Sequence, residues 1–308
     1  MHRTISISLA PESTEILISQ LENIEGVIGL SRARGHSIKP PGDVLTVHVL
    51  NRSADDVLRA VEGVRRSGPF SVVTAEAASF IDSEQQKDIE NDVDEGLWEE
   101  METGLRHQGR VSPNFLALMA MGGAVAALGL VSNPVPQAIA FIASAMIAPG
   151  YEPLAKMPLG LILGRGSVAW RGLKAALCGY AVLIIGAALM FGLLLLLNDS
   201  SARMLAQNPE VRALSLPDSK SVSYSILGGV SGMIMIVAYR RATIAGPLLL
   251  LAIIPAAALV GAAAACGQWG LVKQGIERLM IDIGIIWATG ALVVSIKQIF
   301  THKRRPLS

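Results

Sequence analysis

Charged side chains are scarce in this chain. Asp, Glu, Lys and Arg together make up 17% of its 308 residues, while hydrophobic residues make up 51% and the mean hydropathy is +0.48. Soluble domains usually carry about 25% charged residues, so the composition excludes an ordinary soluble protein. The net charge is +1, and no segment has the basic character of a nucleic-acid surface. We therefore expect no nucleic-acid partner.

Cysteines and catalytic motifs are also scarce. The two cysteines, Cys178 and Cys266, lie in or beside apolar segments and have neither metal-ligand spacing nor a disulfide framework. No apolar segment carries a histidine pair, a Gly-x-Ser-x-Gly turn or paired aspartates, which intramembrane hydrolysis would need. We expect no enzyme activity, no cofactor and no metal. Residues 1–9 lack the apolar core of a signal peptide, which predicts a cytoplasmic N-terminus.

The character of the sequence changes near residue 112. The first part mixes charged and apolar residues as a soluble domain does, whereas residues 115–300 hold several apolar stretches near the roughly 20 residues needed to cross a bilayer. This change predicts a soluble domain followed by a membrane domain. The predicted parts are a cytoplasmic domain over 1–81, an acidic amphipathic linker helix over 82–112, a membrane domain over 113–301 and a basic cytoplasmic tail over 302–308.

The soluble part predicts an α+β fold. Period-two alternation of apolar residues indicates strands, and apolar residues at helical spacing indicate helices between them. The predicted elements are strands at Thr4–Leu9, Val27–Arg34, Val44–Leu50 and Phe70–Ala77, with helices from Pro11 and over Ala54–Arg66. The order βαββαβ is typical of a ferredoxin-like sandwich, which serves either as a packing and oligomerisation module or as a ligand-binding domain.

The linker has ten acidic residues between Asp82 and Glu102, and apolar residues recur every four positions from Ile89 to Leu105. This pattern predicts an amphipathic helix that packs one stripe on the soluble domain or on another subunit. The alternative is an acidic collar that concentrates cations near a pore mouth.

The apolar part predicts about six membrane-spanning helices. Eleven Lys and Arg residues flank their proposed inner ends and five lie in the outer loops, so the positive-inside rule places both termini in the cytoplasm. The predicted spans are Phe115–Val131, Pro136–Gly164, Gly172–Leu197, Val222–Tyr239, Ala242–Cys266 and Leu279–Phe300.

Helix breakers interrupt the second and fifth spans. The first interruption holds Ala148, Pro149, Gly150 and Pro153, and the other holds Gly246, Pro247 and Pro255, 97 residues later. Paired interruptions in two halves of three spans are typical of inverted repeats with a binding site between them. The sequence therefore predicts a 3+3 inverted repeat with broken middle helices. The alternative is a pair of ordinary proline-kinked helices.

The first interruption alone carries a carboxylate. Glu152 lies inside it, and Lys156 follows four residues on as its obvious partner. Unwound carbonyls at Ala148 and Tyr151 with the Glu152 carboxylate would suit a cation or a proton, whereas the following helix N-terminus would suit an anion. In the alternative, the break lies near the inner interface and both charges are solvated.

Asp282 lies near the start of the last predicted span, one turn after Arg278. The spacing predicts an interfacial ion pair between the two side chains. In the alternative, Asp282 would supply a second carboxylate to the binding site.

The motifs Ser144-Ala-Met-Ile-Ala-Pro-Gly-Tyr-Glu-Pro153 and Ile244-Ala-Gly-Pro247, with Pro255 beyond, resemble those of a prokaryotic membrane family called domain of unknown function 389. The resemblance would cover most of residues 1–300. The first motif is one residue shorter than the family pattern, and Pro255 stands where the family has a proline pair. The family implies a location in the prokaryotic cytoplasmic (inner) membrane and no established activity.

The sequence as a whole predicts a non-enzymatic membrane transporter or channel for a small solute or ion, regulated or assembled by its cytosolic domain. We expect a homo-oligomer in the lipid bilayer. The alternative is a membrane-anchored sensor or scaffold whose soluble domain binds a ligand or partner.

Overall fold

The computed structural model describes residues 2–65, 68–77, 79–93, 95–108, 110–215, 218–239, 242–304 and 306–307, and the side chains of 107–108, 239 and 242–252 lie outside the described part. The chain divides into two compact units. One contains residues 1–101 together with 302–308, and the other contains residues 102–301. The first unit therefore takes in part of the predicted linker and the predicted C-terminal tail.

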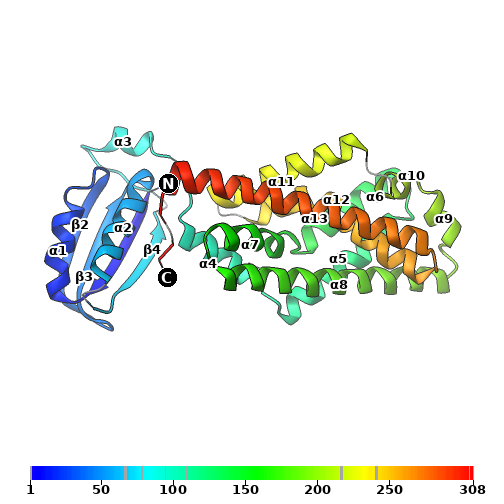
Figure 1. Ribbon diagram of the computed structural model, residues 1–308, viewed down its shortest axis with the longest axis horizontal. Coiled ribbons are helices and arrows are strands. Elements are labelled where there is room, and N and C mark those ends of the chain that lie inside the picture. Colours follow the sequence, from blue (N-terminus) through cyan, green and yellow to red (C-terminus); the bar gives the residue numbers. More distant parts are fainter. Residues whose placement is uncertain are drawn as a thin grey trace. The chain divides into compact units, whose positions relative to one another are not determined.

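A four-stranded antiparallel sheet forms the centre of the first unit (Figure 1). Its strands run in the order β2-β3-β1-β4. Alternate residues of β1 and β3 are fully buried and form one core with the apolar faces of α1 and α2, as period-two and period-3.6 patterns require. The elements are β1 (Arg3–Leu9), α1 (Pro11–Leu21), β2 (Val27–Ile38), β3 (Pro41–Val49), the 3₁₀ turn Asn51–Ser53, α2 (Ala54–Val64) and β4 (Ser71–Glu76).

The predicted single linker helix is wrong. Two short helices, α3 (Gln86–Glu90) and α4 (Trp98–Gln108), replace it. The chain between them is bound to the turn after β3, because the Asn51 side-chain amide donates to the Val93 and Glu95 carbonyls at 2.7 and 2.8 Å. The Asp92 carboxylate accepts the backbone N–H of Asn51 at 2.6 Å. Asn and Asp side chains compete with helical hydrogen bonding in this way.

The acidic residues of α4 are engaged in ion pairs. Arg3 pairs with Glu100 at 3.2 Å, and Arg304 donates to both oxygens of Glu99 at 2.7 and 2.8 Å. Glu102 pairs with Arg106 at 2.8 Å. These three carboxylates of the predicted acidic segment therefore have cationic partners within the chain.

The segment 302–307 is part of the first unit. His302 Nδ1 lies 2.6 Å from Asp55, and its ring lies 4.4 Å from the ring of the buried Trp98. Arg304 bridges Asp55 and Glu99. The Leu307 N–H donates to Glu99 at 2.6 Å, and its side chain packs against the hydrophobic core. In the predicted basic tail, His302 and Arg304 therefore contact two carboxylates of the folded unit.

Protonation should release this segment. Burial raises the pKa of Asp55, but hydrogen bonding from His302 and the charge of Arg304 outweigh it, and the net pKa lies below its ordinary 3.8. Burial also raises the pKa of Glu99, but hydrogen bonding from Arg304 and its charge outweigh burial, and the net pKa lies below its ordinary 4.5. A carboxyl group whose pKa is lowered by folding stabilises the folded state fully at pH values above its ordinary pKa. This stabilisation is lost as the pH falls through the lowered pKa. We expect hydrogen-exchange protection of 302–307, corrected for intrinsic rates, to hold at pH 7 and fall below about pH 4.

Arg304→Gln should remove that protection already at pH 7. Arg59→Gln is the matched control, since Arg59 forms an exposed ion pair with Asp56 on α2. Equal protection of 302–307 in the two variants would contradict the role of Arg304.

Every described element of the second unit is helical, and its longest helices run along the length of the unit (Figure 1). They are α5 (Pro113–Gly129), α6 (Pro134–Ile147), α7 (Tyr151–Ile162), α8 (Gly166–Leu196), α9 (Ala202–Gln207), α10 (Pro209–Ser215), α11 (Ser219–Tyr239), α12 (Ala242–Ala265) and α13 (Trp269–Lys297), followed by a π-helical turn at Gln298–His302. Each predicted span corresponds to one of the long helices or to the pair α6 and α7.

Among the described residues, three helices are long and apolar enough to cross a membrane, namely α8, α11 and α13. The bent pair of α6 and α7 would be a fourth span if it is counted as one. Helix α5 and the segment Ile253–Ala265 of α12 are apolar but shorter. These helices suggest a membrane protein.

Helix α8 packs closely against its neighbours at glycines spaced seven residues apart. A Cβ on Gly172 would lie 2.8 Å from the Pro153 carbonyl oxygen of α7, and one on Gly186 would lie 2.2 Å from the Ala120 carbonyl oxygen of α5. Gly179 faces Phe115 of α5 at 2.8 Å. Small residues allow helix backbones to approach at this distance, so this stripe fixes α5 and α7 on α8.

Candidate functional site at a helix break

The first predicted interruption is confirmed. Helix α6 ends at Ile147, α7 begins at Tyr151, and the two helices are bent by 53°. Ala148 is extended, with φ −84° and ψ 117°, because a residue before proline is driven out of the helical region. Pro149 and Pro153 also lack the N–H groups that a continuous helix would need. Two prolines within five residues therefore divide the span.

Neighbouring groups satisfy part of the freed backbone. The Gly150 N–H donates to the Ala148 carbonyl at 2.8 Å, and the Tyr180 hydroxyl of α8 donates to the Gly150 carbonyl at 3.3 Å. Tyr151 is the first residue of α7, so its carbonyl is helical and not unwound as predicted. Its side chain is fully buried, with the hydroxyl 4.0 Å from the sulfur of Met233. Tyr180 was missed by sequence reasoning, since nothing in its local pattern marks it.

Glu152 lies in the first turn of α7 and is 8% exposed. No described group donates a hydrogen bond to its Oε2 atom. The helix N-terminus favours a carboxylate there, because the unpaired N–H groups carry partial positive charge. A buried carboxylate without a full set of donors is costly, and it is typical of a proton or ion site inside a membrane protein.

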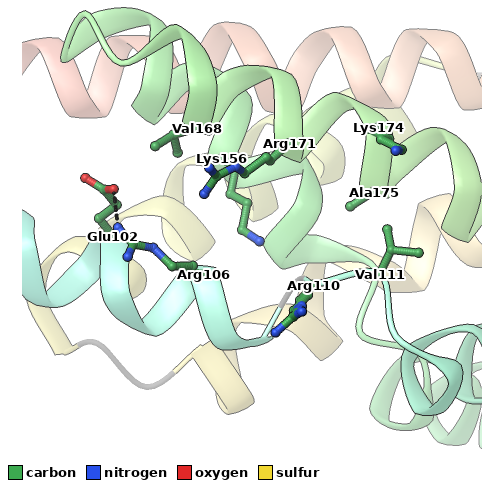
Figure 2. Close-up of a pocket in the computed structure, with 9 residues that line it drawn as sticks. All are labelled: Glu102, Arg106, Arg110, Val111, Lys156, Val168, Arg171, Lys174 and Ala175. Atoms are coloured by element: carbon green, nitrogen blue, oxygen red, sulfur yellow. Dashed lines mark hydrogen bonds and ion pairs between the residues drawn. The ribbon is translucent and has the colours of Figure 1, made fainter.

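Lys156 follows one helical turn later on α7 and is 4% exposed. The charges of Glu152 and Lys156 act on each other. Both side chains are buried in the helical unit, so the alternative in which they are simply solvated does not hold. Lys156 also lines a pocket on the side of α8 that faces the end of α4 (Figure 2).

The second predicted interruption is wrong. Helix α12 is continuous from Ala242 to Ala265. The side chains at Gly246 and Pro247 lie outside the described residues, so the comparison rests on Pro255, which is buried within the helix. An isolated proline removes one hydrogen bond and can remain inside a helix, whereas the first interruption concentrates two prolines and a glycine. The prediction of two matched breaks therefore fails on its second half.

Asp282 is the centre of a buried polar network. Arg278 Nε lies 2.8 Å from Asp282 Oδ2, and the Ser225 hydroxyl of α11 donates to Asp282 Oδ1 at 2.7 Å. Arg278 also donates to the Ser221 and Ser225 hydroxyls at 2.9 and 3.1 Å. The predicted ion pair is confirmed, but it is buried between α11 and α13 and not exposed at an interface. Unlike Glu152, Asp282 has a partner on each oxygen.

Removal of one partner should therefore destabilise the helical unit. In Asp282→Asn the Arg278 charge stays buried without its counter-ion, which we expect to lower the free energy of unfolding by roughly 3–5 kcal/mol. Glu277→Gln is the matched control, because Glu277 forms an exposed pair with Lys273 at 3.8 Å on the same helix. It should change stability by about 1 kcal/mol or less. Equal denaturant midpoints for the two variants in detergent would contradict a structural role for this network.

Among the described residues, no group of three or more His, Cys, Asp or Glu side chains could hold a metal ion. The polar groups near the break are carboxylate, ammonium, hydroxyl and backbone carbonyl groups. They can exchange protons and bind small ions or polar solutes.

Residues 145–288 match the family model described as Domain of unknown function (DUF389). This match confirms the resemblance found in the two motifs, over a shorter range than residues 1–300. It covers the break, Glu152, Lys156 and Asp282, and it leaves out the first unit. No curated protein and no solved structure matches the chain.

Proposed function

We propose that this chain is an integral membrane transporter or channel for a small solute or ion, with the break between α6 and α7 as its site. The observation that carries the proposal is the buried Glu152, whose Oε2 has no hydrogen-bond donor among the described residues. Ionisable groups inside membrane segments are rare and usually lie on substrate or proton pathways. Ala148, Gly150 and Lys156 would complete the site with carbonyl and ammonium groups.

The proposed arrangement has six spans with both termini in the cytoplasm of a prokaryotic cell, in a homo-oligomer within the inner membrane. Support for six spans comes from three long apolar helices, one bent pair and two shorter apolar helices. The cationic residues at the predicted inner ends support the orientation, although Arg240 and Arg241 lie outside the described residues.

We propose a ferredoxin-like fold for the first unit, as a regulator or assembly module of the membrane part. Support comes from the element order βαββαβ and from a fully antiparallel sheet ordered β2-β3-β1-β4. Helices α1 and α2 cover one face of this sheet, and the other face carries half-exposed residues such as Ser6 and Thr46. In the alternative function, a membrane-anchored sensor or scaffold, this half-exposed face would bind a partner.

A flux assay tests the proposal. The full chain is reconstituted in liposomes, and fluxes of protons, alkali cations, chloride and small metabolites are measured against protein-free vesicles. Glu152→Gln keeps the size of the side chain but removes the proton-binding carboxylate, and it should reduce flux by about tenfold or more. Because the buried Lys156 then loses its counter-charge, the melting temperature of the variant in detergent is measured alongside the flux to show that it is folded.

Glu210→Gln is the matched control, because Glu210 is an exposed acid of α10. It should leave flux unchanged. Flux that survives Glu152→Gln would contradict the proposed site. Absence of flux for every species in the wild-type protein would favour the sensor or scaffold.

A further inference from the structure

A pocket of about 420 Å³ lies in the helical unit (Figure 2). One wall comes from the C-terminal half of α4 and the segment that follows it, and the other comes from α7 and α8. Its lining residues are Glu102, Arg106, Arg110, Val111, Lys156, Val168, Arg171, Lys174 and Ala175. The sequence does not reveal this site, because four of its five cations flank predicted spans and Lys156 is predicted to pair with Glu152.

The pocket has a surplus of positive charge. Five of its lining residues are Arg or Lys, and Glu102 is its one carboxylate. That carboxylate is already shared, with Arg106 at 2.8 Å and with Arg165 at 3.2 Å. Within the described part of the chain, Arg110, Arg171 and Lys174 form no ion pair. An anion in the pocket would therefore meet cations that the protein itself leaves uncompensated.

Lys156 is the innermost of these cations. Its side chain is 4% exposed, while Arg106, Arg110, Arg171 and Lys174 are exposed around it. The charge of Arg171 acts on the Lys156 ammonium, and two like charges repel. Gly172 brings α8 against Lys156, since a Cβ there would lie 2.5 Å from the Lys156 Cβ. The opposite charge of Glu152 also acts on Lys156, and a bound anion would further offset the repulsion from Arg171.

The chemistry of the lining indicates the class of ligand. Guanidinium groups bind phosphate oxygens in a bidentate manner, and a lysine ammonium adds a compact charge. The volume exceeds the roughly 30 Å³ that one water molecule occupies in the liquid by more than tenfold, so the pocket has room for more than a bare ion. Val111, Val168 and Ala175 supply apolar contact for the body of such a ligand.

We propose that this pocket binds a phosphate ester, supplied either by a soluble organophosphate or by the headgroup of an anionic lipid. The two sources share a phosphate attached to a small polar body. The inference concerns binding at the pocket, and it holds whether or not the helix break transports a solute.

Two binding measurements with matched chemistry test the proposal on the full chain. In the first, protein in phosphatidylcholine nanodiscs is titrated calorimetrically with glycerol 3-phosphate at constant ionic strength. In the second, native mass spectrometry counts phosphatidylglycerol molecules that stay bound after release from nanodiscs of equal phosphatidylglycerol and phosphatidylcholine content. We expect saturable binding in at least one measurement. Binding in the first identifies a soluble ester, and retention in the second alone identifies a lipid headgroup.

Arg171→Gln with Lys174→Gln should weaken that binding by about tenfold or more, since two charge-assisted contacts are lost. The matched control, Arg203→Gln with Lys220→Gln, removes the same two charge types at exposed positions outside the pocket and should bind as the wild type does. Arg110→Gln, which changes a residue on the opposite wall of the pocket, should also weaken ligand binding. The proposal is overturned if neither ligand binds, or if all three variants bind equally.

Discussion

The architecture of the helical unit depends on how closely other backbones approach α8. Gly172, Gly179 and Gly186 leave no space for a side chain, because a Cβ at each would come within 3 Å of an atom of α5 or α7. Gly261 of α12 makes a similar approach, with a Cβ position 2.2 Å from the Ile184 carbonyl oxygen. Helices that pack at this distance gain dispersion contacts over their whole length. The close contact of α8 with α7 at Gly172 holds α7 in place directly after the break. It also brings Tyr180 of α8 to the Gly150 carbonyl.

Two buried carboxylates in this unit have opposite surroundings. Asp282 has an arginine and a serine on its two oxygens, so its burial is compensated and its effect is structural. Glu152 has a helix N-terminus and a lysine on the next turn, but no described donor at Oε2. A buried polar atom without a partner is unusual and calls for an explanation, such as a bound water or ion or a functional role. This contrast is the physical basis for the proposal that the site lies at Glu152.

Local chemistry explains which features the sequence could predict. Pro149 and Pro153 act on their own turn, so the break was visible in the motif. The strands of the first unit were visible because one face of the sheet is buried and period two follows. Contacts between distant residues were not visible: Asn51 ending the linker helix, Arg304 joining Asp55 and Glu99, and Tyr180 at the break. The prediction of a break at Pro255 failed because a single proline can remain inside a helix.

The position of residues 302–307 has a consequence for synthesis of the protein. The core of the first unit forms from residues near the N-terminus, yet Leu307 packs against it and Arg304 balances two of its acids. On the ribosome, the strands and helices of that unit emerge long before these partners, which follow the last long helix. Until then Asp55 and Glu99 lack their contacts with Arg304. The first unit therefore reaches its final stability only after α13 has been made. Full stability of the first unit thus requires that the whole helical unit has been synthesised.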